Sequence, residues 1–301
     1  MDNQAEVRDF LRTRRDRITP EQAGIVGGGG RRRLPGLRRE EVAMLAGMSS
    51  DYYAKMERGN LAGVSPEVLD ALARALRLDD AESEHLHDLA RAANPSPSRR
   101  RSRPAPSAIR PSLQRFLDAI TGAPAWVVNQ RADIIALNSL GRALLAPLLE
   151  DPDARNNQAR FIFLSPAART FYPQWDAAAD AAAASLRTAA GRNPRDTHLT
   201  DLIGELVTRS DAFSNRWSAH DVRLHNSGTK HIRHRDVGDL EFVYEAMQLP
   251  DHPGWTLFAY TSAAGSPTEE RIRLLGSLAS TPTEAPAPAP DTQRTGLRRA
   301  E

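Results

Sequence analysis

The segment from Leu37 to Gly59, LRREEVAMLAGMSSDYYAKMERG, constrains the fold of this 301-residue chain more than any other. Ala43 stands four residues before Gly47, and Ser49 precedes a second stretch with the apolar spacing of a helix. Two helices that cross closely need a small residue at the crossing, a glycine that accepts positive φ in the turn, and a capping side chain. The segment therefore predicts a helix-turn-helix. Its expected buried positions are Val42, Ala46, Met48, Tyr53 and Met56.

The residues around this motif also have helical patterns. Apolar residues recur at helical spacing from Val7 to Arg17, Ser65 and Pro66 have the pattern of a helix start, and Asp79 opens a further helical stretch that continues to Ala93. We therefore expect a first domain over residues 1–93 that is an all-α bundle of five helices.

Arginine is concentrated near the motif. Between Arg8 and Arg39 there are ten arginines and only three acidic residues, and a Gly-rich stretch at 24–35 predicts a flexible basic loop. A genome rich in G and C raises arginine content overall, since the chain has only two lysines, but it does not explain clustering. Clustered arginines are typical of proteins that bind a polyanion. The arginines expected to contact phosphates are Arg31, Arg32, Arg33, Arg38 and Arg39.

The second helix of the motif is the expected recognition helix, with double-stranded DNA as its partner. An ordinary helical hairpin is the alternative, and the capping pattern and the neighbouring arginines argue against it. The residues expected to reach base edges and adjacent phosphates are Ser49, Ser50, Asp51, Tyr52, Lys55 and Arg58.

The composition changes after the first domain. Residues 94–108 are rich in Pro, Ser and Arg and predict a linker, and residues 281–301 predict a disordered Pro/Ala-rich tail. Between them, residues 109–280 combine helical patterns with an apolar run at 125–138, which predicts two short strands joined at 130–132, and with β-rich runs at 222–224, 230–234, 240–249 and 255–261. We expect an α+β domain with a three- or four-stranded antiparallel meander that has helices on one face.

Aromatic residues gather at the seams of this second domain. They either fill a core or line an apolar pocket, and core filling is the default for any one of them. His220 and Arg223 are candidates to hold a ligand carboxylate, and a surface salt bridge is the alternative for each. The aromatic candidates for the pocket are Phe116, Trp126, Phe161, Phe163, Phe171, Tyr172, Trp175 and Trp217.

Enzyme and metal chemistry have little support in the sequence. The chain has no cysteine, His85 and His87 diverge on a helix, and His231 and His234 fall on opposite faces of a strand. The Ser-x-x-Lys pattern that ends at Lys230 lies in a predicted hairpin turn and has no companion motifs. We therefore expect no catalytic residues, no metal and no cofactor. No apolar stretch is long enough for a membrane span, so we expect a cytoplasmic protein.

The two halves together resemble a known family. GGGGRRRLPGLRREEVAMLAGMSSDYYAKMERG, FLSPAARTFYPQWDAAAD, GTKHIRHRDVGDLEFVYEAMQL and GWTLFAYTSAAGSPTEERIRLL are similar to actinobacterial regulators that join an XRE-type helix-turn-helix to an MmyB-like domain. The resemblance spans roughly residues 8–278. It implies a PAS-like fold for the second domain and a fatty-acid-like ligand.

These observations lead to one functional prediction and one alternative. The chain is predicted to be a sequence-specific DNA-binding transcription regulator, acting as a homodimer, whose operator affinity responds to an apolar ligand in the second domain. The alternative keeps DNA binding but gives the second domain only a dimerisation or protein-docking role.

Overall fold

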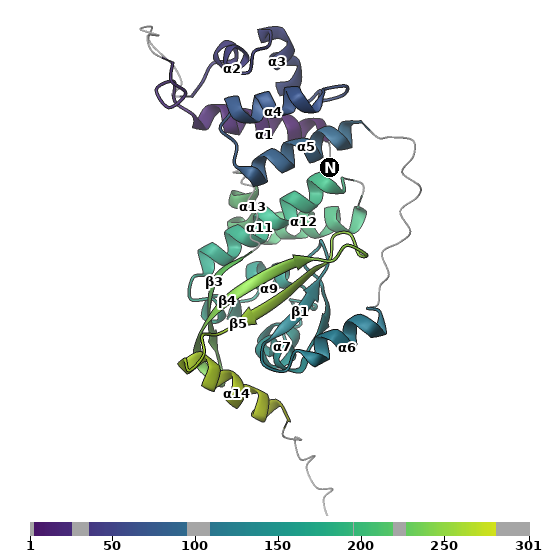
Figure 1. Cartoon of the computed structure of the whole chain (residues 1–301), viewed down its shortest axis with the longest axis vertical. Helices are drawn as coiled ribbons and strands as arrows, with labels where there is room; N and C mark the ends of the chain where they lie inside the picture. The colour runs from purple at the N-terminus through teal and green to yellow at the C-terminus, as the bar shows by residue number, and fades with distance from the viewer. Residues whose placement is uncertain (1–2, 26–35, 95–108, 195, 219–226, 281–301) are drawn as a thin grey trace, which may run out of the picture.

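A computed structural model of the chain describes residues 3–25, 36–94, 109–194, 196–218 and 227–280. Two domains follow one another along the chain and are stacked along the long axis of the molecule (Figure 1). The predicted basic loop beyond residue 25, the linker from residue 95, the strand at 222–224 and the tail from 281 lie outside the described residues. None of the described helices is both long and apolar enough to cross a membrane.

The described part of the first domain consists of the expected five helices. Their apolar faces meet in one core, in which Phe10, Tyr53 and Leu86 are fully buried. Asp79 caps the last helix, because its carboxylate accepts a hydrogen bond from the backbone N–H of Glu82 at 2.8 Å. The helices are α1 (Asn3–Arg17), α2 (Arg39–Leu45), α3 (Ser50–Glu57), α4 (Pro66–Ala75) and α5 (Asp80–Ala93).

The second domain combines helices with one sheet, so the predicted α+β class is confirmed. Its strands are β1 (Ala125–Val128), β2 (Ile134–Leu137), β3 (Ser227–His234), β4 (Gly238–Gln248) and β5 (Thr256–Thr261). Its helices are α6 (Pro111–Ala119), α7 (Ser139–Leu144), α8 (Ala146–Leu149), α9 (Gln158–Leu164), α10 (Ala167–Phe171), α11 (Trp175–Arg192), α12 (Thr197–Arg209), α13 (Asp211–Ser218) and α14 (Pro267–Ser280).

The described sheet has five antiparallel strands in the order β2-β1-β5-β4-β3. The meander β3-β4-β5 is as expected, but the hairpin β1-β2 joins it along β5, where Trp126 lies opposite Phe258. The described meander has three strands, within the expected three or four, but the pairing of the two short strands with it was not predicted. Local apolar spacing carries no information on pairing between strands more than a hundred residues apart.

The sheet has helices on both faces, which corrects the expectation of one. The inner face carries Trp126 and Phe242, which belong to the large apolar core shared with α9, α10 and α11. On the outer face, Val127 and Leu257 pack against Leu117 of α6 in a separate small core. The inner face is therefore the only place in the described domain where many aromatic residues share one core.

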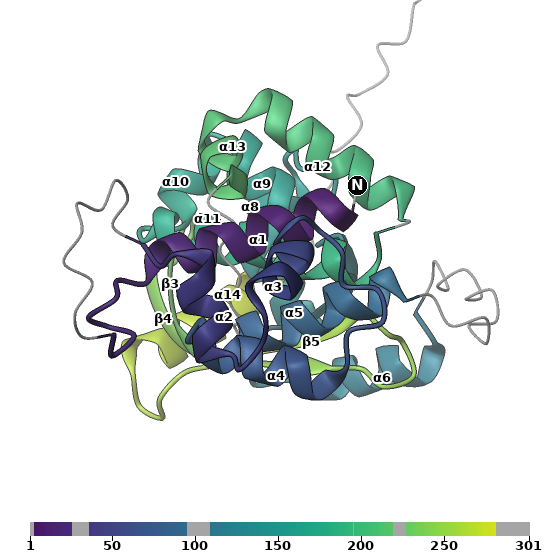
Figure 2. The same cartoon turned by 90° about the horizontal axis from the view of Figure 1, so that it is seen from above.

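The first domain rests on the helices of the second. Helices α1 and α5 lie between the helix-turn-helix and α11 (Figure 1). Figure 2, which views the molecule from the side of the first domain, shows α2 and α3 in front of the second domain. The helix-turn-helix is therefore at the end of the molecule that faces away from the sheet.

Candidate nucleic-acid interface and ligand site

The turn between α2 and α3 has the predicted geometry. Gly47 has φ of +66°, and a Cβ built there meets nothing within 4 Å, so the backbone conformation and not lack of space requires glycine. The backbone N–H of Met48 donates to the carbonyl of Ala43 at 2.9 Å, which closes the end of α2. Ala43 itself is 2% exposed at the crossing of the two helices.

Helix α3 presents a polar face to solvent. Ser49 caps it, since its hydroxyl accepts a hydrogen bond from the backbone N–H of Tyr52 at 3.2 Å. Tyr53 and Met56 are fully buried, as predicted, and Tyr52 is half-buried against the same core. The residues that remain exposed are Ser49, Ser50, Asp51, Lys55 and Arg58.

A buried carboxylate holds α3 against α1 and α2. Glu57 is 2% exposed, and its two oxygens accept hydrogen bonds from Arg15 at 2.7 Å and from Arg39. Burial opposes ionisation of Arg15, but the Glu57 carboxylate outweighs this effect and raises the pKa of Arg15. Arg39 was predicted to contact phosphates, and in this structure it is also a partner of Glu57. Sequence reasoning missed the role of Glu57, although it lies four residues after the buried Tyr53 and so shares its helix face.

The arginines of this region line a surface hollow beside the start of α3. The hollow has a volume of about 480 Å³. Three of its lining residues are cationic and one is acidic, and Arg15 and Arg39 are also paired with Glu57, so the hollow has a small excess of positive charge that can attract a phosphate. Arg31, Arg32 and Arg33 lie outside the described residues. The residues that line the hollow are Arg15, Arg38, Arg39, Glu40 and Ser50.

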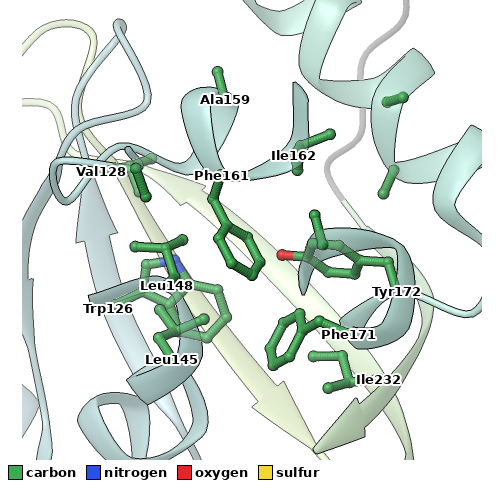
Figure 3. Close-up of a cluster of buried hydrophobic side chains, with 14 of the residues drawn as sticks. Trp126, Val128, Leu145, Leu148, Ala159, Phe161, Ile162, Phe171, Tyr172 and Ile232 are labelled. Atoms are coloured by element: carbon green, nitrogen blue, oxygen red, sulfur yellow. The ribbon is translucent and has the colours of Figure 1, made fainter. Parts of the chain in front are cut away.

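Four of the predicted aromatic residues meet on the inner face of the sheet. The rings of Trp126, Phe161, Phe171 and Tyr172 point toward one another from β1, α9 and the end of α10 (Figure 3). Ring centroids are 5.6 Å apart for Phe161 and Phe171 and 4.8 Å apart for Phe171 and Tyr172. None of the four is more than 2% exposed. We call these four residues the inner aromatic cluster.

Other predicted aromatic residues form a second group nearer the first domain. Phe163 lies between Trp175 and Phe213, with ring centroids 6.2 Å and 4.9 Å away, and Phe213 stacks on Trp217 at 5.4 Å. Phe213 was missed, although it is four residues before Trp217 and so shares its helix face. Phe116 belongs to neither group, because it is 55% exposed on α6. The interpretation of Phe116 as a pocket residue beside the others is therefore wrong.

Two polar groups lie among the apolar residues of the inner face. Lys230 is opposite Phe242 in the sheet, and its ammonium is 5.1 Å from the centroid of the Tyr172 ring. Burial lowers the pKa of Lys230 to about 8 and raises the pKa of Tyr172 to about 12. No carboxylate of the described residues forms an ion pair with Lys230. The indole N–H of Trp126 is buried, and no hydrogen-bond acceptor for it lies in the described part of the chain.

Lys230 was missed as a site residue, and the sequence signal for it was strand alternation. It shares the inner face with Ile232, which is two residues further along β3 and 2% exposed. Ser227 and Lys230 lie in β3 and not in a turn as predicted, and three residues apart on a strand they face opposite sides. His220 and Arg223 lie outside the described residues. The described residues contain no group of His, Asp and Glu that would hold a metal ion.

The fold defines a class of protein before any comparison. A capped helix-turn-helix with an exposed polar recognition helix is a DNA-binding domain, and an α+β domain follows it. Comparison with known families matches residues 6–86 to a helix-turn-helix domain and residues 109–275 to the MmyB-like transcription regulator ligand binding domain. The second match covers more than half of the chain, which therefore belongs to the MmyB-like helix-turn-helix transcription regulators. A search of curated proteins found no match.

Proposed function

We propose that the protein regulates transcription by binding a two-part operator as a homodimer, with α3 in the major groove. The observation that carries this proposal is the exposed polar face of α3. Glu57 fixes this helix by its ion pairs with Arg15 and Arg39, and a positive surface hollow lies beside its start. A rigidly held recognition helix with flanking cations meets the two demands of sequence recognition, which are base contacts and phosphate contacts.

Sequencing the genomic DNA that the purified chain retains tests this proposal. The expected result is a set of fragments that share an inverted repeat with half-sites about one helical turn apart. Retention of fragments in proportion to their abundance, with no shared sequence, would contradict sequence-specific binding.

We further propose that the effector is an amphipathic acid with an apolar chain of fatty-acid type. The inner aromatic cluster supplies apolar surface, and Lys230 and the indole N–H of Trp126 are polar groups that lack a described charged or hydrogen-bonding partner. Each methylene of the acyl chain that is buried in an apolar core contributes about 0.8 kcal/mol to the binding free energy. Several methylenes together can offset the cost of separating rings that are in contact without a ligand. Burial disfavours the protonated form of Lys230, and a ligand carboxylate beside it would stabilise that charged form.

The effector proposal is tested by thermal unfolding and by operator binding on the same full-length chain. Dodecanoic acid is expected to raise Tm, and operator affinity is expected to change by about 5- to 150-fold, the range typical of coupled sites. Stabilisation without a change in operator affinity would indicate a structural lipid. No stabilisation by acids of any chain length would favour the dimerisation or protein-docking role.

That second function has an observation in its favour. Phe161, Phe171 and Tyr172 already contact one another, as expected of a core that needs no ligand. Mass spectrometry of lipids extracted from the purified protein separates the two functions, because only the effector function predicts an acyl chain that co-purifies.

The anchor for the carboxylate has two candidates, Arg223 from the sequence and Lys230 from the structure. Replacing the true anchor, by Arg223→Ala or by Lys230→Met, is expected to weaken binding of dodecanoic acid while dodecanol binds as before. Equal weakening of the acid and the alcohol would show that the replaced side chain acts through packing alone.

A further inference from the structure

A buried arginine of the second domain is paired with a carboxylate of the first. Arg187 of α11 is 1% exposed, and its guanidinium donates hydrogen bonds to the Glu6 carboxylate of α1 and to the backbone carbonyl of Trp217. The guanidinium carbon also lies 4.0 Å from the centroid of the Trp217 ring. Glu6 is 8% exposed, so both members of this ion pair are removed from water by the contact between domains.

Two further contacts position α5 on the same helix. The ring of His85 is so close to Gly191 that a Cβ at that position would be 2.7 Å from the ring. His85 is 1% exposed and lies against Phe10, with ring centroids 5.1 Å apart, so it has little freedom to move away. The guanidinium of Arg192 donates to Asp88 at 2.9 Å and also pairs with Glu84.

Helix α1 connects Glu6 to the recognition helix. Helix α1 carries both Glu6 near its start and Arg15 near its end, and Arg15 holds Glu57 of α3. A shift of α1 relative to α11 therefore moves α3 as well, since the ion pair of Arg15 with Glu57 ties the two helices together.

Within the second domain, Arg187 is connected to the aromatic core by a series of packed rings. Trp217 stacks on Phe213, and Phe213 packs on Phe163 with 4.9 Å between ring centroids. Phe163 is on α9, the short helix that also carries Phe161 of the inner aromatic cluster. Arg187 is therefore in direct contact with the last of a series of packed rings that begins beside the proposed ligand site.

We propose that the contact of α11 with α1 and α5 couples the two domains, and that Arg187 is the residue on which this coupling depends. With Arg187 paired to Glu6, the helix-turn-helix is held in one orientation on the second domain. Loss of the pair releases the first domain, which then turns independently. Only the part of this inference that concerns an effector rests on the proposed function.

The physical reason is the cost of a buried charge that loses a counter-charge. If Arg187 is removed while the domains stay docked, Glu6 keeps its burial but loses the Arg187 counter-charge, and His85, whose Nε2 lies 3.8 Å from a Glu6 oxygen, remains beside it. Separation of the domains returns Glu6 to water and removes this cost. Release is therefore the favoured response to the loss of Arg187, which also removes its contacts with Trp217 inside the second domain.

Distances between spin labels on the full-length chain test the docking. Because the chain has no native cysteine, Glu67→Cys and Asp201→Cys place one label on an exposed site of each domain, and dilution with unlabelled chain removes distances between protomers. A narrow distance distribution is expected for the otherwise unchanged chain and a broad one with Arg187→Met. The matched control is Arg216→Met, since Arg216 also lies over a tryptophan but, among the described residues, forms its ion pairs with Asp176 and Asp180 of its own domain.

Gly191→Ala provides a second variant that leaves the ion pair intact. Alanine favours a helix over glycine, but here its Cβ would meet the buried ring of His85. We expect a broad distribution for this variant as well. A distribution that stays narrow with both Arg187→Met and Gly191→Ala, or one that is broad before any substitution, would overturn the docking.

The coupling is measured with the operator fragment and saturating dodecanoic acid. Operator affinity of the unchanged chain and of Arg216→Met is expected to shift at least about fivefold, and the shift is expected to fall below about twofold with Arg187→Met. A full shift in Arg187→Met would overturn the coupling role of Arg187. If the unchanged chain binds the acid without any shift, both the effector function and the coupling fail, and the label distances still decide whether Arg187 docks the domains.

Discussion

Glu57 in the first domain is buried and Lys230 in the second is half-buried among apolar side chains, yet only Glu57 has counter-charges among the described residues. Glu57 accepts hydrogen bonds from two arginines that come from two other helices. Lys230 faces aromatic rings, and burial alone accounts for its lowered pKa. A buried charge that is paired fixes one arrangement of helices, whereas one without a counter-charge lowers the free energy of unfolding until an anion binds beside it. The charge of Glu57 is thus paired within the first domain, whereas Lys230 in the second domain has no described counter-charge and could pair with an anionic ligand.

The largest expected effect is the loss of the Glu57 charge. Glu57→Gln leaves Arg15 without its main counter-charge, and it is expected to lower the free energy of unfolding of the first domain by about 3–5 kcal/mol. Chemical denaturation followed by circular dichroism measures this loss. Glu245→Gln, at an exposed position of β4, is the control and is expected to change stability by less than about 0.5 kcal/mol. Equal stability of both variants would show that Glu57 is not a structural clamp.

The next effect concerns the arginines that precede the motif. Changing Arg31, Arg32 and Arg33 together to alanine is expected to weaken binding to operator and to random DNA alike. If each arginine neutralises one phosphate, the slope of log affinity against log salt falls by up to about 3. Fluorescence anisotropy titrations at several salt concentrations measure the slope. A loss confined to the operator, with the slope unchanged, would instead assign base contacts to these arginines.

Single residues of the recognition helix should have smaller effects that depend on sequence. Lys55→Ala and Arg58→Ala are each expected to lower operator affinity by about 1–3 kcal/mol and to relax specificity at the contacted base pairs. Arg142→Ala, at an exposed position of α7, is the charge-matched control for Arg58→Ala. Gel-shift titrations measure these effects. Full operator affinity in both variants, with folding intact, would rule out this placement of α3.

The smallest effect is a pH-dependent gain in stability from removing Lys230. Burial lowers the pKa of Lys230 from its ordinary value of 10.5 to about 8, so the charged form destabilises the folded chain below pH 8. As pH rises from 8 to 10.5, the unfolded chain holds more protons and the free energy of unfolding rises. Lys230→Met is therefore expected to stabilise the ligand-free chain by about 1–2 kcal/mol at pH 7, with the gain shrinking from pH 8 upward and lost above pH 10.5.

Denaturant unfolding at pH 7 and pH 9.5 measures the gain from Lys230→Met. Lys55→Met, which replaces the exposed lysine of the recognition helix, controls for the change of residue type. A gain that is the same at both pH values would mean that the effect is due to apolar packing of methionine and not to the lysine charge.

The helix-turn-helix could be predicted from sequence because its determinants are local. Ala43, Gly47 and Ser49 lie within seven residues, and each has a conformational role that the neighbouring chain imposes. Local apolar spacing also predicted the helices around the motif and the strands of the second domain within a few residues. The family resemblance agreed with both domain matches.

Only the tertiary structure decided which residues that are distant in the chain contact one another. The β1-β2 hairpin pairs with β5, Arg187 reaches Glu6 across 181 positions, and the predicted aromatic residues divide into two groups that leave Phe116 outside. Apolar periodicity states that a residue is buried, but it does not state against which residue. Partners are chosen when loops close and cores pack together, and the energies that decide this choice belong to the whole fold.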